Sequence, residues 1–181
     1  MTDLRIIEES RKGNINSFRK LIEDTSPFVY RVALRMVGQS DAARDIVQET
    51  MITVWQNLAK IKSVQAYRNW VYRIALNKCY DDLRKKQRNF ENTADDSTWK
   101  IISEKTADNT ISGFESEEAI KIIDLLASQL SPVQKAVFIL SEIDDMSHDE
   151  ICGITGMSKN KVKSNLYYAR KNITGLIEKY L

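Results

Sequence analysis

The stretch SHDEICGITGMSKNKVKSNLYYARKNI, residues 147–173, predicts a helix-turn-helix. It opens with a capping box, in which Ser147 is followed three residues later by Glu150, and this predicts the start of a short helix. Gly156 then allows a tight turn, and Ser158 can cap a second helix. The apolar side chains of that second helix recur at the spacing of one face and are Val162, Leu166, Ala169 and Ile173.

The remaining side chains of the second helix are polar, and residues 158–181 hold six basic side chains against one acidic side chain. In a helix-turn-helix the first turns of the second helix enter the major groove, where Lys and Asn reach base edges and Tyr and Arg suit phosphates. A helical hairpin with a basic surface is the alternative. The change from acidic to basic character between the two helices favours DNA binding. The predicted outer face comprises Ser158, Lys159, Asn160, Lys161, Lys163, Ser164, Asn165, Tyr167, Tyr168 and Arg170.

The sequence before this motif predicts a second helical unit and a linker. Ser131, Pro132 and Gln134 form another capping box with a proline in the first turn. Residues 93–118 are rich in Asn, Thr, Asp and Ser, with seven acidic side chains against two basic ones. This stretch is too long for an ordinary loop in a compact domain. We therefore expect a flexible acidic linker between a unit at 1–92 and a unit at 119–181.

Helix signals also fill residues 1–92, where no alternation typical of a strand is found. Asn16 is predicted to cap one helix, and Ser26-Pro27 to start the next, which ends at Gly38. Ser40 or Asp41 is predicted to cap a further helix. The expected fold is all-α, with two small helical domains.

The helix after Gly38 has an apolar stripe and an acidic-polar face. The stripe comprises Ala43, Ile46, Val47, Met51, Val54, Trp55 and Leu58. The opposite face presents Asp45, Gln48 and Glu49, whose carboxylates could pair with a basic partner or could simply be solvated.

Cations and aromatic rings alternate in the next predicted helix, and residues 68–88 hold seven basic and two acidic side chains. This mixture suits unpaired bases, which stack on rings while cations follow the phosphates. The alternative is that Tyr67 and Trp70 belong to the core with Ile74. The interleaved residues are Tyr67, Arg68, Trp70, Tyr72, Arg73, Lys78 and Tyr80.

Composition excludes several classes of protein. The 181 residues include 13 Leu, 20 Ile, 10 Val and 5 Phe, enough for a core, and no apolar run approaches the length of a membrane span. The first residues lack the apolar stretch of a signal peptide, so a soluble cytoplasmic protein is expected. Cys79, Cys152 and His148 do not complete a zinc site, and no phosphate loop or nucleophile elbow is present. We expect no metal, no cofactor, no small-molecule substrate and no enzymatic activity.

Three strings together resemble bacterial RNA polymerase sigma factors of the extracytoplasmic-function (ECF) type. They are FVYRVALRMVGQSDAARDIVQETMITVWQNL (28–58), YRNWVYRIALNKCYDDLRKKQR (67–88) and LSPVQKAVFILSEIDDMSHDEICGITGMSKNKVKSNLYYARKNI (130–173). The first two resemble conserved region 2 of the family and the third resembles region 4. The resemblance covers about 1–90 and 119–175.

The resemblance implies that residues 1–92 are sigma region 2, 93–118 the linker, and 119–181 sigma region 4. It implies a dissociable subunit that binds core RNA polymerase and directs initiation by recognising minus-35 and minus-10 promoter elements. The implied core-docking residues are Asp45, Gln48 and Glu49, against the β′ clamp helices, with the first helices of region 4 near the β flap. The implied minus-10 residues are Lys60, Lys62, Arg68, Asn69, Arg73, Asn77 and Arg84. The implied minus-35 residues are Ser158, Lys159, Asn160, Lys161, Lys163, Ser164, Tyr167 and Arg170.

The same resemblance implies a further partner, because ECF factors are commonly held by an anti-sigma factor, often a membrane-linked one. Three alternatives stay open at the level of sequence. A free-standing DNA-binding regulator would use residues 147–173 alone. A helical adaptor would bind no nucleic acid. An enzyme would rest on Asp81-Asp82 and little else.

Overall fold

The computed structural model describes residues 4–61, 63–91 and 130–180, and every regular element in them is helical. The amino-terminal unit comprises α1 (Leu4–Arg11), α2 (Ile15–Val37), α3 (Ser40–Asn57), the 3₁₀ turn η1 (Leu58–Lys60) and α4 (Val64–Glu91). The carboxyl-terminal unit comprises α7 (Pro132–Phe138), the π-helical turn η2 (Ile139–Ile143), α8 (His148–Thr155) and α9 (Lys159–Tyr180). The all-α prediction is confirmed, whereas the predicted linker lies outside the described residues.

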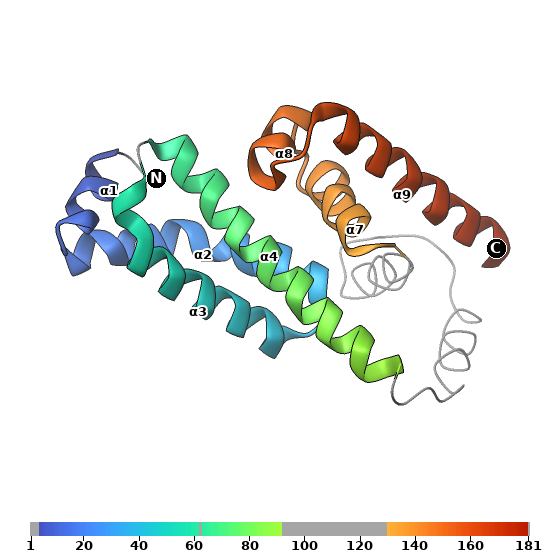
Figure 1. Ribbon diagram of the computed structural model, residues 1–181, viewed down its shortest axis with the longest axis horizontal. Coiled ribbons are helices and arrows are strands. Elements are labelled where there is room, and N and C mark those ends of the chain that lie inside the picture. Colours follow the sequence, from blue (N-terminus) through green and yellow to red (C-terminus); the bar gives the residue numbers. More distant parts are fainter. Residues whose placement is uncertain (1–3, 62, 92–129, 181) are drawn as a thin grey trace, which may run out of the picture.

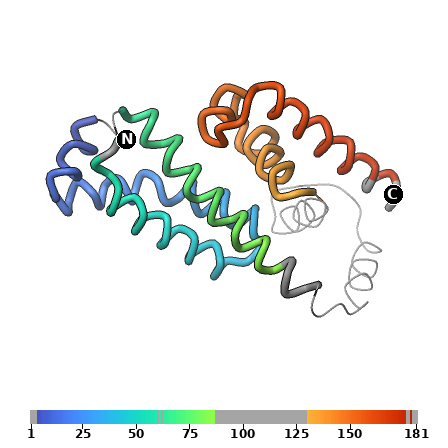
Figure 2. Tube along the Cα trace, viewed as in Figure 1, coloured from blue at the N-terminus to red at the C-terminus, as the bar shows by residue number. Residues whose placement is uncertain are grey.

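Figure 1 shows α2, α3 and α4 side by side in the amino-terminal unit, with α1 across one end. Figure 2 follows the same path, from blue through green, before the orange and red trace of the carboxyl-terminal unit. Apolar residues of α2, α3 and α4 meet in one core, whose most enclosed members include Leu21, Met36, Val54 and Val71. No helix in the described part of the chain has the length and apolar content that a membrane span requires.

Helix α2 differs from the prediction because it runs unbroken through Ser26 and Pro27. Its N-cap is Asn14, not Asn16, and the Asn14 side chain accepts hydrogen bonds from the backbone of Asn16 and Ser17. Pro27 has no N–H for the helix, a loss that costs about 3 kcal/mol in a helix interior. Burial on both sides of Pro27 outweighs this loss, because the buried stripe continues from Leu21 through Val29 to Met36.

Several predicted helix ends are confirmed by the backbone. Gly38 ends α2 in the left-handed region, with φ of 71°, and its N–H donates to the carbonyl of Leu34. Gly156 ends α8 in the same way, with φ of 74°. The N-cap of α3 is Gln39, one residue before the predicted Ser40, and it makes no side-chain capping bond.

The carboxyl-terminal unit packs directly on the amino-terminal unit in this structure. Helix α8 lies against α4, and α7 and η2 contact α2 (Figure 1). Buried residues from both units, among them Leu76 of α4 and Ile154 of α8, belong to one apolar cluster. A contact between the units was left open by the sequence, because residues far apart along the chain form it.

Candidate functional site

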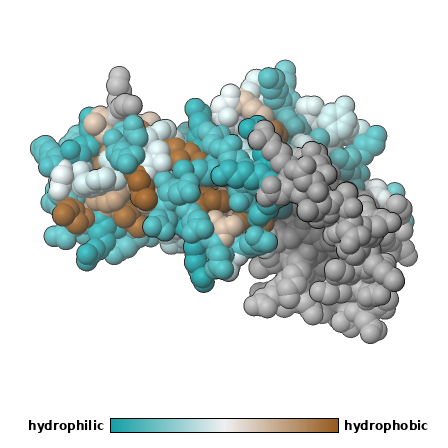
Figure 3. Space-filling model, turned by 60° about the horizontal axis from the view of Figure 1, so that its bottom comes forward, coloured by the Kyte–Doolittle hydropathy of each residue, from teal (hydrophilic) through white to brown (hydrophobic). Residues whose placement is uncertain are grey.

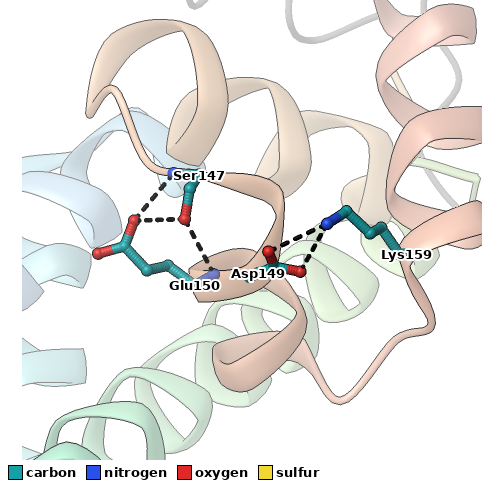
Figure 4. Close-up of polar contacts among 4 residues, drawn as sticks. All are labelled: Ser147, Asp149, Glu150 and Lys159. Atoms are coloured by element: carbon teal, nitrogen blue, oxygen red, sulfur yellow. Dashed lines mark hydrogen bonds and ion pairs between the residues drawn. The ribbon is translucent and has the colours of Figure 1, made fainter.

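The predicted helix-turn-helix is present, and a capping box begins its first helix as expected. The Ser147 hydroxyl accepts from the backbone N–H of Glu150 at 3.3 Å, and the Glu150 carboxylate accepts from the backbone N–H of Ser147 at 2.9 Å (Figure 4). The Ser147 hydroxyl also donates to this carboxylate at 2.7 Å. These hydrogen bonds lower the pKa of Glu150, because they stabilise its ionised form. The box therefore satisfies backbone N–H groups at the start of α8.

Helix α9 divides into the two faces that its sequence predicts. Val162, Leu166 and Ala169 are buried, and Ile173 is partly buried. The opposite face is open to solvent, with Tyr167 and Tyr168 in edge-to-face contact at 5.4 Å between ring centroids. The residues of α9 and its cap with predicted minus-35 roles are all exposed: Ser158, Lys159, Asn160, Lys161, Lys163, Ser164, Tyr167 and Arg170.

Two cations of this exposed face are paired with acids of the same unit. Lys159 contacts both carboxylate oxygens of Asp149, at 2.9 and 3.0 Å, so that α8 and the start of α9 are joined (Figure 4). Arg170 contacts Glu142 at 2.8 Å, and this hydrogen bond lowers the pKa of Glu142. Lys161 and Lys163 have no ion pair within the described residues. Both side chains can therefore meet a phosphate or a base without first leaving an ion pair.

The predicted minus-10 residues are spread along α4 and differ in their surroundings. Arg68 and Asn77 are exposed, and Arg84 pairs weakly with Asp81 at 3.7 Å. Lys60 ends η1, where its side chain is not described, and Lys62 lies outside the described residues. The structure therefore brings part of the predicted set to one helix.

Two predicted minus-10 residues contact the carboxyl-terminal unit. The guanidinium of Arg73 donates to the backbone carbonyls of Ile154 and Gly153, both at 2.9 Å. Asn69 lies beside Gly153, and its side chain accepts a hydrogen bond from Gln65 at 2.9 Å. Nothing in the spacing of α4 predicted these contacts, because their partners are about 80 residues away.

The aromatic residues of α4 are not a stacking surface, and the interpretation as one is wrong for two of them. Tyr67 is fully buried and its hydroxyl lies 3.3 Å from that of Thr25. Burial raises the pKa of Tyr67 to about 12. Tyr72 is 7% exposed and its ring packs on Phe28 with centroids 4.1 Å apart. Trp70 is partly buried against the core. For Tyr67 and Trp70 the core position was the alternative interpretation, whereas the burial of Tyr72 was not expected.

The predicted docking residues lie on the exposed face of α3. Asp45, Gln48 and Glu49 are all exposed. Glu49 also contacts Lys78 of α4 at 2.8 Å, and this hydrogen bond lowers the pKa of Glu49. Asp45 has no ion pair within the described residues. The three side chains thus share a surface, with Glu49 partly neutralised by α4.

An apolar groove of about 850 Å³ adjoins these residues, between α2 and α3, and the sequence analysis missed it. Gln48 lines the groove, as do Phe18 and Trp55, whose rings lie 4.6 Å apart. Trp55 is 45% exposed, so its assignment to the buried stripe was wrong. Figure 3 shows apolar surface among hydrophilic side chains on the amino-terminal half of the molecule. The sequence contained a sign of this groove, because the apolar residue Ile52 lies one turn beyond Gln48 on the exposed face of α3.

Cysteine and metal chemistry find no support in the described residues. Burial raises the pKa of the Cys79 thiol to about 12, as expected of a core cysteine that stays protonated. Both cysteines are free. Within residues 4–61, 63–91 and 130–180, no cluster of three or more His, Cys, Asp or Glu side chains could hold a metal ion.

Comparison with known proteins assigns each of the two units to a family model. Residues 21–89 match the family model of sigma-70 region 2, and residues 120–173 match that of sigma-70 region 4. The chain is 31% identical over 152 residues to the ECF RNA polymerase sigma factor SigL of Mycobacterium tuberculosis, covering 83% of each chain. It is 26% identical over 174 residues to the ECF RNA polymerase sigma factor SigW of Bacillus subtilis, covering 91% of each.

Solved structures support the fold. The chain resembles CnrH in its complex with the cytosolic domain of CnrY, with a TM-score of 0.72 and 20% identity, over 98% of this chain and 97% of that one. It also resembles the sigma factor RpoE of Bartonella quintana, in complex with the anti-sigma factor NepR, with a TM-score of 0.66 and 19% identity. That match covers 91% of this chain and 98% of the other.

Proposed function

Because the chain belongs to the sigma-70 family, as an RNA polymerase sigma factor of the ECF type, we propose a division of work between its two units. The carboxyl-terminal unit reads the minus-35 element, and the amino-terminal unit docks on core polymerase and engages the minus-10 element. The family consists of transcription initiation factors and not of catalytic enzymes. Our proposed limits for the parts are 1–92 for region 2, 93–118 for the linker and 119–181 for region 4.

The solvent-exposed polar face of α9 is the observation that carries this proposal. The face follows a turn that Gly156 and Ser158 shape, and its inner side is held by Val162 and Leu166. A helix supported in this way can enter the major groove with its first turns. Lys161 and Lys163 stand there without an ion pair in the described structure, so we assign them the first contacts with bases or phosphates.

We further propose that α3 provides the acidic part of the polymerase-docking surface. Asp45, Gln48 and Glu49 share an exposed face, and carboxylates in this setting suit a basic partner. The β′ clamp helices are the proposed partner for this face, and the β flap is the proposed partner for the first helices of region 4. The cations of α4 that remain exposed, such as Arg68, are proposed to follow the opened minus-10 strand.

An anti-sigma factor is a proposed further partner. Both solved relatives are held in complexes, one with the cytosolic domain of CnrY and the other with an anti-sigma factor. We expect this partner to compete with core polymerase, acting in the cytoplasm, where promoter DNA is found. Co-purification from the native host, followed by release of transcription activity, would identify it.

The decisive experiment is run-off transcription with core RNA polymerase, on promoter fragments that include the region upstream of the gene itself. Lys163→Glu should reduce minus-35-dependent initiation by about tenfold or more, since a single lost base or phosphate contact accounts for that range. Core binding by this variant should be unchanged. Lys20→Glu, the same change at an exposed site on α2, is the matched control and should initiate normally. Loss of core binding in Lys163→Glu would contradict the assignment of α9.

The docking proposal has its own variant. Asp45→Arg should weaken binding of core polymerase, because it places a cation where a basic partner is expected. Glu8→Arg, an exposed charge reversal on α1, is the control. An affinity of Asp45→Arg equal to that of the control would count against the clamp assignment. Folded protein that binds no core polymerase at all would overturn the proposed function.

A further inference from the structure

The turn η1, which joins α3 towards α4, is held by a side chain from the first helix of the chain. The carbonyl of Ala59, in the middle of η1, accepts a hydrogen bond from the guanidinium of Arg11 at 2.7 Å, across 48 positions. Arg11 is the last residue of α1, and α1 lies across the end of the amino-terminal unit at which η1 is found (Figure 1). The contact therefore links α1 to the turn that ends at Lys60.

The peptide unit that Arg11 holds is the one that leads into Lys60. A peptide bond is planar, so a restraint on the carbonyl oxygen of Ala59 also fixes the plane through which the chain enters the next residue. Short 3₁₀ turns have hydrogen bonds of poorer geometry than an α-helix, and in η1 the backbone N–H of Ile61 donates to the carbonyl of Leu58 at 3.2 Å. A charged donor makes a stronger bond than a neutral one, so Arg11 adds a firm restraint to a turn that is weakly held by its own backbone.

Arg11 can act as an anchor because α1 is itself fixed on the rest of its unit. Ile7 is fully buried in the core. The carboxylate of Glu9 accepts a hydrogen bond from the hydroxyl of Ser17, in α2, at 2.6 Å. Gly13, with φ of 88°, lies in the short link between α1 and α2. The end of α1, and with it the backbone of Arg11, therefore has a defined position relative to α2.

The core holds the same turn from its inner side. Leu58 is 3% exposed and Ile61 is 7% exposed, so the residues at the start of η1 and just after it are both buried. Ala59, between them, is exposed. Burial thus fixes the two ends of the segment 58–61, and Arg11 restrains its exposed middle.

We propose that Arg11 is a positioning residue for minus-10 recognition, which holds the peptide unit between Ala59 and Lys60 in the orientation in which this turn meets the opened strand. The inference rests on the proposed minus-10 role of Lys60. Groups that recognise a ligand must be held to within about half an ångström of their working positions, which gives such a restraint a use. Because the side chain of Arg11 is exposed, direct contact with a DNA phosphate is the competing role, and it predicts different results.

The first test measures base discrimination by the holoenzyme. Arg11→Ala, reconstituted with core RNA polymerase, should lower run-off initiation on the preferred promoter by about fivefold, the effect of losing one hydrogen bond from a charged donor. The ratio of initiation between this promoter and templates with single base-pair changes in the minus-10 element should fall by about threefold. A general loss of folded protein would lower initiation on all templates by the same factor. An unchanged ratio would therefore overturn the inference.

Two further variants serve as rescue and control. Arg11→Lys keeps a charged donor and should recover most of the ratio, because a single hydrogen bond does not require the fork of a guanidinium. Arg5→Ala removes another exposed arginine of α1, which contacts Glu9 of the same helix at 3.1 Å, and should keep the wild-type ratio. A ratio lowered equally in Arg5→Ala would assign the effect to α1 as a whole and overturn the role of Arg11.

A double-mutant cycle separates positioning from contact with a phosphate. Ile61→Ala loosens the turn from its core side and leaves Arg11 in place. If Arg11 acts through the turn, the fold-loss of initiation in the double variant should be smaller than the product of the two single losses. Independent losses, together with a salt dependence of DNA binding that falls by about one phosphate contact in Arg11→Ala, would overturn the positioning role.

Hydrogen exchange in the free protein tests the restraint without reference to DNA. The backbone amide of Ile61, followed by NMR, should exchange about threefold or more faster in Arg11→Ala than in the wild type, because its turn opens more often. Circular dichroism checks that all variants remain helical. Unchanged exchange at Ile61 would overturn the inference. Run-off transcription by the wild-type protein tests the sigma role separately, so failure of the proposed function and failure of this restraint are distinguishable.

Discussion

Two basic helices of this protein present the same chemistry in different surroundings. Helix α9 carries its cations on a face that is open to solvent, and its inner face packs against α7 and α8. Helix α4 is longer, and its Arg73 and Asn69 contact the last turn of α8. The comparison teaches that a basic stripe in the sequence marks only a candidate surface for nucleic acid. Whether that stripe is available depends on what packs over it.

The largest expected effect is on stability, and it tests the packing beneath α9. Leu166→Ala removes a side chain that is 3% exposed beneath the solvent-exposed face of α9. Loss of such a buried leucine costs about 2–5 kcal/mol, from lost burial and the cavity that remains. Thermal unfolding followed by circular dichroism should show this loss. Tyr168→Ala, on the outer face of the same helix, should change stability by no more than about 0.5 kcal/mol. Equal effects would mean that the two faces are wrongly assigned.

The next largest effect tests the contact between α4 and α8. Arg73→Ala removes two hydrogen bonds to α8 carbonyls and should cost about 1–3 kcal/mol, as charged hydrogen-bond donors do. Urea denaturation measures this difference. Arg68→Ala, one turn earlier on α4 and exposed, should stay within about 0.5 kcal/mol of the wild type. A neutral Arg73→Ala would show that α8 is held on α4 by apolar contacts alone.

A smaller effect concerns the capping box that begins α8. Ser147→Ala should lower stability by about 1 kcal/mol at neutral pH, the usual cost of losing an N-cap. The bonds from Ser147 lower the pKa of Glu150 in the folded state, so their contribution is present above the unfolded pKa and is lost as pH falls through the folded pKa. The difference between wild type and variant should therefore shrink in acid. Urea titrations at several pH values check this, and a difference that grows in acid would contradict the assignment.

The smallest effect concerns the pairing of Lys159. Asp149→Ala breaks an exposed ion pair, and such pairs contribute about 0–1 kcal/mol. Stability should hardly change, while Lys159 becomes free to meet DNA and binding of minus-35 DNA should tighten modestly. Fluorescence anisotropy at two salt concentrations measures this, with the gain expected to decrease at higher salt. A clear loss of DNA affinity would instead assign Asp149 to the positioning of α9.

Local signals in the sequence predicted most of the helix-turn-helix. The capping boxes at Ser131 and Ser147, and the turn at Gly156, involve residues only three or four positions apart, so the pattern contains both partners. The two faces of α9 follow from helical period alone. The ECF resemblance identified the family from two motif blocks in order, which the family models confirm.

Local sequence patterns were misinterpreted where packing between distant residues decides the structure. Ser26-Pro27 has the local signature of a helix start, but burial of α2 on α3 and α4 carries the helix through it. Tyr67 and Tyr72 alternate with cations along the chain, yet both point into the core. Trp55 fits an apolar stripe and is nevertheless half exposed beside a groove. In each case the conformation or burial depends on residues distant in the sequence, which the local spacing cannot identify.

The sequence by itself determined the all-α class, the caps of the helix-turn-helix, the basic character of α4 and α9, and the family. These properties depend on interactions within a few residues, whose energies are set by residue type and spacing. Only the tertiary structure decided that Asp144 meets Arg31 and Arg35, and that Arg73 caps α8. Those partners are separated by about 80 to 113 positions, and their meeting depends on how two units bury a common apolar surface.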